Sequence, residues 1–268
     1  MSKRKGFTLI ELLVVISIVA LLAAILMPAL QRARRQSKAI VCQANLHQWA
    51  LVFSAYTGDY DGYFMKGWLG VEPGGYDQGA GIWMNATRSY YADSNDIRLC
   101  PMATKPYSEG GRPGFNGAWG ISRSVAQAAI NGDSCSYTIN WWVNNPTPIT
   151  LTSVVGGKTK YHWRHVHQKS ANNIPVLVDG LMWLARPNHT DAPPDYNGDY
   201  EWSKGGGMKR ICTNRHDGCI NGVFMDWSVR KMGLKQLWKY KWHRGFDTLM
   251  GPGPNEWPFW MKSFKEYY

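Results

Sequence analysis

The sequence lacks the short motifs that mark several classes of enzyme. It contains no G-x-S-x-G nucleophile elbow, no H-E-x-x-H zinc-binding pattern and no C-x-x-C pair. Gly157, Lys158 and Thr159 match the end of a phosphate-binding loop, but Thr152 stands where that loop would open with glycine. No nucleophile is grouped with a base either. The sequence therefore argues against an enzyme. A secreted hydrolase is the least favoured of the functions that the sequence allows.

A second absence is that of charge near the N-terminus. No charged side chain occurs from Leu12 to Gln31, although the mean hydropathy of the whole chain, −0.35, excludes a polytopic membrane protein. A run of about 20 apolar residues is long enough to cross a bilayer as a helix. Lys3, Arg4 and Lys5 precede this run and supply part of the net charge of +11. Positive charge at this place holds the N-terminal end on the cytoplasmic side.

The helical pattern continues beyond the apolar run. Apolar residues recur with the spacing of one helical face at Cys42, Leu46, Trp49, Ala50 and Phe53. This spacing predicts one helix from about Leu9 to Tyr56, ended by Gly58 in a left-handed cap. Pro28 removes one hydrogen bond and should kink or open the helix. A helix that continues in this way argues against removal of the apolar run as an ordinary signal peptide.

The segment KGFTLIELLVVISIVALLAAILMPAL resembles the N-terminus of type IV prepilins and type II secretion pseudopilins. In that family a prepilin peptidase cuts between a glycine and a phenylalanine and then methylates the new N-terminus. The resemblance places the cut between Gly6 and Phe7. Glu11 and Pro28 then stand at the family's acidic and helix-breaking positions.

This resemblance implies a membrane-anchored precursor that becomes a filament subunit. An unpaired carboxylate at mid-membrane costs about 2.5–3.5 kcal/mol. Glu11 is therefore expected to pair with the amino group of Phe7 on a neighbouring subunit, which would fix the register of the filament. The implied partners are the prepilin peptidase, other pilin or pseudopilin subunits and the inner-membrane assembly platform. The resemblance leaves open whether the filament is a type IV pilus or a type II secretion pseudopilus. It also leaves open whether this chain is a major or a minor subunit.

The same resemblance divides the chain into four parts. Residues 1–6 form a leader, 7–30 a transmembrane and filament-core helix, 31–56 its amphipathic continuation, and 57–268 an exported body. The precursor would cross the inner membrane once, with its N-terminus in the cytoplasm and its body in the periplasm. After assembly it would lie in a periplasmic or surface filament.

The body is predicted to be α+β, with an antiparallel sheet packed against the second half of the long helix. Its strand candidates alternate with turn residues and show no βαβ rhythm; they are 135–143, 174–184, 220–225 and 228–232. Short helices are predicted at 122–131 and 233–242. Together with the long N-terminal helix, these elements predict a pilin-like fold.

The body also carries a second, weaker resemblance. Cys42-Gln-Ala-Asn45-Leu46, Gly62-Tyr63-Phe64 and Leu99-Cys100-Pro101 are similar to prepilin-like proteins of Planctomycetes, Verrucomicrobia and Lentisphaerae, which often end in an H-X9-DG motif. Here His216 is followed after nine residues by Asp226, but Trp227 replaces the glycine. This departure argues against a glycine-dependent turn. The plain interpretation is that Asp226 joins two hairpin strands and that His216 is structural.

Five cysteines offer two disulfide pairs in an oxidising compartment. Cys42 on the helix and Cys100 before Pro101 are the first candidate pair. Cys212 and Cys219 flank a possible turn and are the second, which leaves Cys135 as a buried residue. Connectivity cannot be deduced from sequence alone, so both pairs are hypotheses.

Two further groups of residues have the composition of metal sites. Asp195, Asn197, Asp199 and Glu201 alternate along a loop, as oxygen ligands of calcium do, although a solvated acidic turn has the same pattern. Several pseudopilins carry calcium in a late loop, so the resemblance also points to that ion. His162, His165 and His167 lie close together without a carboxylate, which favours histidines packed among aromatic residues over a metal site.

The body is rich in aromatic residues, with 14 tryptophans and 14 tyrosines. Most should belong to the core or to subunit contacts, and an exposed subset would suit stacking on sugars. Basic residues also gather between Lys204 and Arg244. The alternative to a purely structural subunit is therefore a binding module, displayed by the helix, that holds polysaccharide or DNA.

Overall fold

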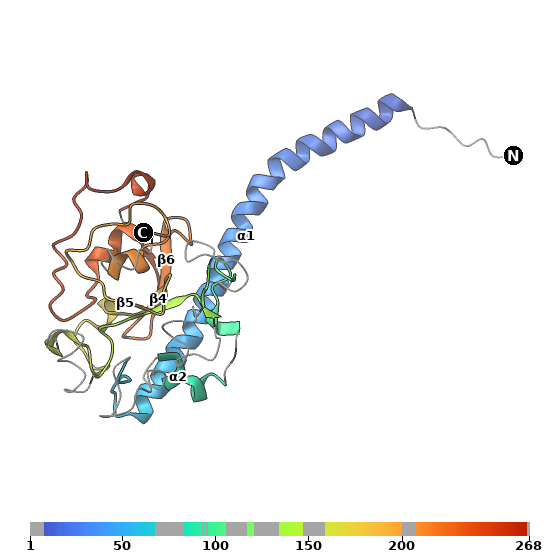
Figure 1. The fold of residues 1–268 in the computed structure, drawn as a ribbon. Coiled ribbons are helices and arrows are strands. Elements are labelled where there is room, and N and C mark those ends of the chain that lie inside the picture. The colour runs from blue at the N-terminus through green and yellow to red at the C-terminus, as the bar shows by residue number, and fades with distance from the viewer. Residues whose placement is uncertain are drawn as a thin grey trace. The chain divides into compact units, whose positions relative to one another are not determined.

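The structure is a computed structural model that describes residues 8–67, 83–92, 94, 96–105, 117–120, 134–146, 159–199 and 207–266. The chain forms two compact units, one ending at Lys38 and the other beginning at Ala39. Helix α1 (Leu9–Asp59) contributes to both units and is drawn in blue in Figure 1. The predicted helix 122–131 lies outside the described residues.

Helix α1 ends three residues later than predicted and by a different cap. Its last residue is Asp59, and Gly58 lies within the helix, not in a left-handed cap. The left-handed residues are Asp61 and Gly62, and the Gly62 N–H donates to the Thr57 carbonyl at 2.7 Å. A Cβ at Gly62 would lie 2.3 Å from the His165 ring, so this position requires glycine for space as well as for backbone conformation.

The body is built on a five-stranded sheet in the order β5-β3-β4-β6-β7. The strands are β3 (Tyr137–Asn140), β4 (Pro175–Asp179), β5 (Leu184–Ala185), β6 (Cys219–Phe224) and β7 (Val229–Gly233). A separate pair joins β1 (Trp119–Gly120) to β2 (Ser134–Cys135). All neighbours in the large sheet are antiparallel except β3 and β5, which run parallel. The predicted α+β pilin-like class is confirmed, with a mixed sheet where an antiparallel one was expected.

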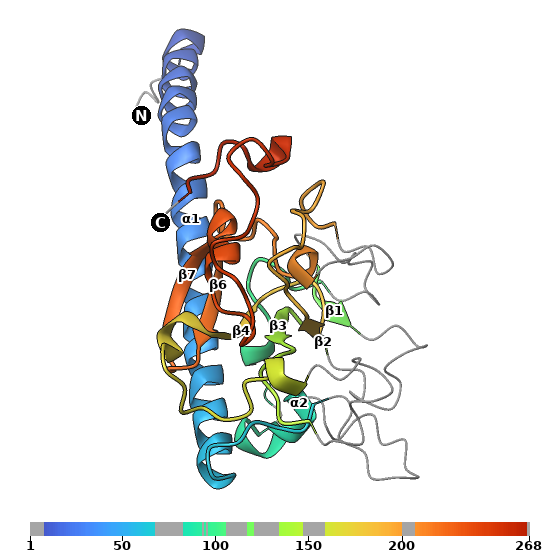
Figure 2. The ribbon, with the colours of Figure 1, turned by 90° about the vertical axis from the view of Figure 1, so that its left-hand side faces the viewer.

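Short helices lie before the first strand, between strands and after the last strand. They are α2 (Trp83–Ala86), η1 (Arg88–Tyr90), η2 (Asp96–Arg98), η4 (Thr159–Tyr161), η5 (Ala171–Asn173), η6 (Gly207–Arg210), η7 (Leu234–Lys239) and η8 (Phe259–Met261). The helix predicted at 233–242 is the 3₁₀ helix η7, which is shorter because Gly233 still belongs to β7 and Tyr240 returns to an extended conformation. Figure 2 shows α1 beside β6 and β7 in the body.

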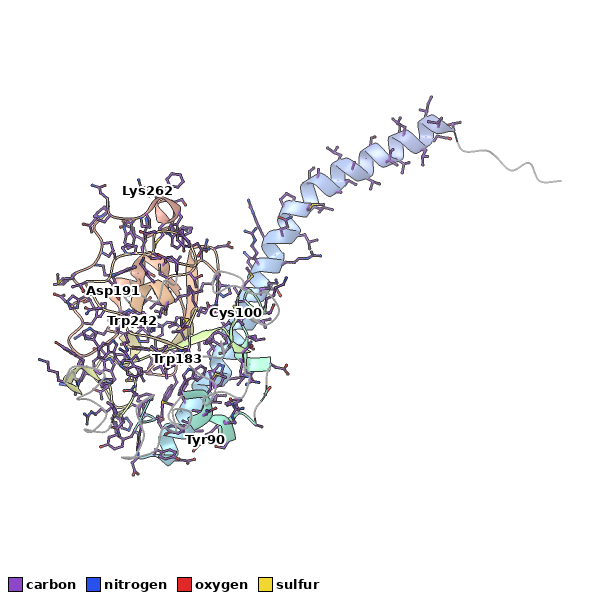
Figure 3. The ribbon with its side chains drawn as sticks, in the orientation of Figure 1. Tyr90, Cys100, Trp183, Asp191, Trp242 and Lys262 are labelled. Carbon is purple, nitrogen blue, oxygen red and sulfur yellow. The ribbon has the colours of Figure 1, made fainter. Side chains whose placement is uncertain are left out.

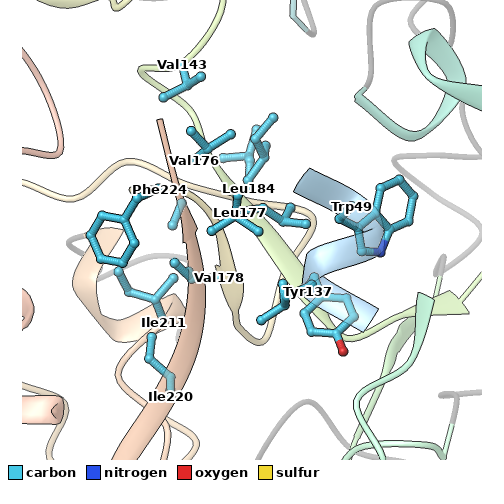
Figure 4. Packing of buried hydrophobic residues seen from close by; sticks show 14 of the residues in the cluster. Trp49, Tyr137, Val143, Val176, Leu177, Val178, Leu184, Ile211, Ile220 and Phe224 are labelled. Atoms are coloured by element: carbon cyan, nitrogen blue, oxygen red, sulfur yellow. The ribbon is translucent and has the colours of Figure 1, made fainter. Parts of the chain in front are cut away.

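The hydrophobic core occupies both faces of the sheet. All residues of β4 and β6 are buried, as expected for central strands covered on two sides. Leu177 and Tyr137 lie on the side of Trp49 from α1, whereas Phe224 and Ile211 lie on the opposite side (Figure 4). The amphipathic face predicted for the second half of α1 is confirmed by its buried residues, among them Cys42, Leu46, Trp49 and Phe53. The helix therefore covers one face of the sheet.

The turn between β6 and β7 contains one residue in the left-handed backbone conformation, and this residue is Trp227, not glycine. The Trp227 N–H donates to the Phe224 carbonyl, the Phe224 N–H donates to the Ser228 carbonyl, and Trp227 has a φ of 65°. This geometry matches a type I turn followed by a left-handed residue, which is usually glycine. The interpretation that this segment joins two hairpin strands is confirmed, and the left-handed turn forms although the glycine is missing. Trp227 occupies the glycine slot of the H-X9-DG motif and packs its ring near Phe64, with 6.3 Å between ring centroids.

We expect replacement of Trp227 to separate backbone strain from packing. Trp227→Ala removes the ring and keeps a Cβ in the left-handed conformation, whereas Trp227→Gly removes the ring and also the steric penalty of about 1–2 kcal/mol. The glycine variant should therefore have a free energy of unfolding about 1 kcal/mol above that of the alanine variant, measured by urea titration. Equal stability of the two variants would show that the left-handed backbone carries no penalty here.

Candidate functional site: the N-terminal helix and a buried polar cluster

The start of α1 is closed by a reciprocal hydrogen-bonded cap. Thr8 donates through its N–H and its hydroxyl to Glu11 Oε2 at 2.8 and 2.7 Å, and the Glu11 N–H donates to Thr8 Oγ1 at 3.3 Å. This is a capping box, which satisfies donors that the first turn of a helix leaves unpaired. The T-x-x-E spacing before an apolar run is a local signal for this cap, although it was not among the features predicted above. Glu11 thus has partners within its own chain.

The apolar run of α1 is exposed along its length in the isolated chain. Side chains from Leu9 to Leu30 are exposed on every face of the helix, and Pro28 is accommodated without ending it. Among the described residues, α1 is the one helix long and apolar enough to cross a membrane. A helix that is apolar all around requires lipid or other helices as its surroundings. The predicted cleavage residues Gly6 and Phe7 lie outside the described residues.

Four side chains from distant parts of the sequence converge in the interior of the body. Cys42 lies on α1, Cys100 follows η2, Asp179 ends β4, and His216 precedes β6. All four are buried, and their sulfur, oxygen and nitrogen atoms lie within 4.8 Å of one another. Figure 3 places Cys100 against α1. The sequence suggested a link between Cys42 and Cys100, but neither Asp179 nor the position of His216 was foreseen.

The Asp179 carboxylate of this cluster is also paired with Arg215, which is fully buried. Its guanidinium lies 3.4 Å from Asp179 Oδ1 and donates to the carbonyls of Ser136, Gly180 and Gly117. Burial alone would raise the pKa of Asp179, but the neighbouring His216 and Arg215 lower it to about 2. Asp179 therefore stays ionised in the core.

The neighbours of His216 raise its pKa, whereas those of Asp179 lower the pKa of that carboxyl. Burial lowers the pKa of the His216 imidazole, but contact with Asp179 Oδ2 at 3.2 Å outweighs burial and raises the pKa to about 10. Cys100 Sγ lies 3.5 Å from His216 Nε2. The structural role predicted for His216 in the C-terminal motif thus takes the form of a buried contact with a carboxylate and a thiol.

No disulfide is present among the five cysteines, all of which lie in the described part of the chain. Cys42 and Cys100, the first predicted pair, are neighbours in the buried cluster. Cys212 Sγ instead contacts Met261 Sδ at 3.9 Å, and Cys219 begins β6. Cys135 is buried, as predicted. The two pairings stay predictions.

The acidic loop proposed for calcium is paired with a lysine. Lys209 Nζ lies 2.6 Å from Asp199 Oδ2 and 3.6 Å from Asp195 Oδ2. Asn197 Oδ1 accepts a hydrogen bond from the Asn214 N–H at 2.8 Å. Glu201 lies outside the described residues. The oxygens described in this loop therefore have partners within the protein. Calcium binding stays a prediction.

The three clustered histidines occupy different environments. His162 is buried beside the rings of Trp142 and Trp141, and its two ring nitrogens have no hydrogen-bond partner. His165 is half-buried, and its Nε2 lies 2.9 Å from the Asp61 carbonyl. Burial, and then the charges of Arg164 and other nearby cations, lowers the pKa of His162 to about 4. This arrangement matches histidines packed among aromatic residues.

The depressed pKa of His162 predicts a pH-dependent stability. A histidine titrating near pH 4 when folded and near 6.5 when unfolded contributes stability above pH 6.5 that is lost as the pH falls toward 4. The loss amounts to about 3 kcal/mol. His162→Phe keeps a ring in the pocket and removes the titration, so its free energy of unfolding should fall less over this range. Parallel pH profiles for both proteins would contradict the assignment.

The tryptophans whose side chains the structure describes belong to the core and its margin. Each described tryptophan side chain is buried or half-buried, and several donate their indole N–H to main-chain carbonyls, as Trp49 does to Ile97 at 2.7 Å. Figure 3 shows Trp183 and Trp242 inside the body. The exposed aromatic set required by the sugar-binding alternative is not found among them. Trp68 and Trp202 lie outside the described residues.

Comparison with known proteins supports the interpretation of the N-terminal segment. A family model described as the prokaryotic N-terminal methylation motif matches residues 1–27. The N-terminal segment of the chain is therefore type IV prepilin-like.

The chain is also similar to the type IV wide pilus major component PilA4 of Thermus thermophilus. The two are 44% identical over 63 residues, which cover 24% of this chain and 48% of that protein. The chain therefore spans about half the length of this relative. No solved structure matches the chain.

Proposed function

We propose that the protein is a structural subunit of a type IV pilus or of a type II secretion pseudopilus. The observation that carries this proposal is a capped helix whose first part lies within the methylation motif and is apolar on every face, and whose second part continues into the core of a folded body. A disposable signal peptide would not share a helix with the core. The similarity to a pilus component favours the pilus.

In this proposal each of the four parts of the chain has a separate task. Residues 1–6 are the leader that the peptidase removes between Gly6 and Phe7. Residues 7–30 hold the subunit in the inner membrane and later pack at the filament axis. Residues 31–56 connect this segment to the exported body, 57–268, which would face the periplasm. Delivery into the filament requires a peptidase and an assembly platform as partners.

Glu11 would exchange one partner for another during assembly. In the isolated chain its carboxylate accepts two hydrogen bonds from Thr8, which reduces the cost of placing it at the edge of a membrane. In a filament, the amino group of Phe7 on a neighbouring subunit would offer a full positive charge. Contacts that are not closed by symmetry then repeat along an open helix.

The test compares the N-terminus and the assembly of three variants with those of the wild type. Intact mass of the mature protein should correspond to a chain beginning at N-methylated Phe7. Glu11→Ala should be processed normally but fail to assemble. Thr8→Ala, the matched control, should lose about 1 kcal/mol of helix capping yet still assemble, because the intersubunit charge pair remains. Gly6→Val should stay unprocessed.

Two outcomes would contradict the proposal. A mature chain that begins after Ala24 would show an ordinary signal peptide and a soluble exported body. Normal filament assembly by the Glu11→Ala variant would remove the register role of Glu11. The binding-module alternative remains a prediction, tested by retention of the wild-type protein on immobilised polysaccharide or DNA at low salt.

A further inference from the structure

We propose that Cys42, Cys100, Asp179 and His216 bind one zinc ion, which fastens helix α1 to the body. The four residues come from four separate parts of the chain, and only Cys42 belongs to α1. The proposal does not depend on the proposed function, because all four residues lie within the compact unit that begins at Ala39.

The spacing of the four side chains matches the edges of a tetrahedral zinc site. With zinc bonds of about 2.3 Å to sulfur and about 2.0–2.1 Å to nitrogen or oxygen, a tetrahedron has sulfur–oxygen and sulfur–nitrogen edges of about 3.5 Å and a nitrogen–oxygen edge of about 3.3 Å. Cys42 Sγ lies 3.6 Å from Asp179 Oδ2, and Cys100 Sγ lies 3.5 Å from His216 Nε2. His216 Nε2 lies 3.2 Å from Asp179 Oδ2. The remaining separations are all below 4.8 Å.

The chemistry of the donors selects zinc among the common metal ions. Two sulfurs, an imidazole nitrogen and a carboxylate oxygen form a mixed soft and borderline set, which suits zinc and not calcium or magnesium. All four residues are buried, and all four positions of the tetrahedron are supplied by protein. A closed site of this kind is structural, because a catalytic zinc keeps one position open for water or substrate.

The residues around the four donors suit a bound metal. Zinc with two thiolates, one carboxylate and a neutral imidazole carries one negative charge, which the buried Arg215 neutralises from 3.4 Å. The Tyr137 hydroxyl donates to Cys42 Sγ at 3.6 Å, and the Asn221 N–H donates to Asp179 Oδ2 at 2.8 Å. Such outer hydrogen bonds orient the ligands of metal sites.

Two other states of the same residues are the alternatives to be tested. Cys42 and Cys100 lie close together, so they could form a disulfide in place of binding zinc. This is the pairing expected for an exported protein. The cluster is also charge-paired without metal, through the contacts of Asp179 with His216 and Arg215. Zinc, disulfide and metal-free cluster differ in metal content and in the number of thiols, so one set of measurements separates them.

The experiment uses the full-length protein in detergent, purified without chelator and incubated with equimolar zinc chloride. Elemental analysis after removal of free metal should give one zinc per chain. Thiol titration of the denatured protein in excess chelator should give all five cysteines as thiols. Replacement of zinc by cobalt should give a thiolate-to-cobalt charge-transfer band together with the strong visible bands of tetrahedral cobalt. Chelation should lower the thermal midpoint of the body, because zinc binds the folded state.

Variants assign the metal to these four residues. Cys100→Ser and His216→Gln should lose the stoichiometric zinc and change or abolish the cobalt spectrum. Cys135→Ser and Cys212→Ser, matched changes at buried cysteines outside the cluster, should keep both. Tyr137→Phe removes only a hydrogen bond to a ligand, so it should retain the stoichiometry and bind zinc about 10–100-fold more weakly.

The outcomes decide between the three states. Three thiols and no zinc would show the disulfide and overturn the proposal, and five thiols without zinc or a cobalt spectrum would show the metal-free cluster and overturn it as well. Retention of zinc by both Cys100→Ser and His216→Gln would place the metal elsewhere. Should these two variants fail to fold, the cobalt spectrum of the wild type decides alone, since its charge-transfer band requires cysteine ligands.

Discussion

Replacement of Arg215 by methionine should lower the free energy of unfolding of the body by about 3–5 kcal/mol. The change leaves the ionised Asp179 buried with less positive charge around it, and it removes the donor to the carbonyls of Ser136, Gly180 and Gly117. Removing one partner of a buried ion pair costs this much because the other charge stays desolvated. Methionine has a similar length, so loss of packing is a minor part of the effect.

The measurement is urea unfolding of the full-length protein in detergent, followed by tryptophan fluorescence. Every tryptophan lies beyond Lys38, so the signal reports the body and not the apolar segment of α1. Lys231→Met, at an exposed position of β7, is the control and should change stability by less than about 0.5 kcal/mol. Arg215→Lys should recover part of the loss, since it keeps the charge but cannot serve the same set of acceptors. An Arg215→Met variant as stable as the control would refute the role of this charge.

The long N-terminal helix follows closely from the sequence. The apolar run without charge and the apolar spacing after it predicted a single helix, and α1 confirms it from Leu9 to Asp59. These signals are local, because a helix pairs residues four positions apart and buries one face. The prediction was wrong at the C-terminal cap, where tertiary contact of Gly62 with His165 decides which glycine is left-handed.

The sheet was predictable where neighbouring strands are also neighbours in the chain. Strands β6 and β7 were located within one or two residues, because a hairpin is marked by alternation and by a short turn. The parallel pairing of β3 with β5 was not foreseen. It joins Ile139 to Leu184, far apart in the chain, through a two-residue strand for which no local pattern exists.

The contacts within the buried cluster could not be predicted from the sequence. Asp179 stands at the end of an apolar strand, a position that also suits an ordinary turn residue. Its contact with Cys42 spans 137 positions, and that between Cys100 and His216 spans 116. Only the folded sheet brings these four side chains together. An isolated polar residue beside a fully apolar strand is the one local signal that would have singled out Asp179.

The second large effect is expected at Trp49, the residue that anchors α1 in the core of the body. Its side chain is fully buried, packs edge-on against Trp83 with 4.8 Å between ring centroids, and lies 4.9 Å from the Tyr91 ring. Its indole N–H donates to the Ile97 carbonyl at 2.7 Å. Trp49→Ala should lower the free energy of unfolding by about 3–5 kcal/mol, because it leaves a large cavity between the helix and the body.

Two further variants separate the contributions of Trp49. Trp49→Phe keeps an aromatic ring but leaves the buried Ile97 carbonyl without its donor, so it should cost about 1–3 kcal/mol. Leu51→Ala, on the exposed face of the same helix, should cost less than about 0.5 kcal/mol beyond the small change in helix propensity. Losses of stability that decrease from Trp49→Ala to Trp49→Phe to the Leu51 control in urea titrations would show that both the ring and the indole N–H of Trp49 hold the helix on the body. An equal loss at Trp49 and Leu51 would show instead that the body and the second half of α1 unfold independently.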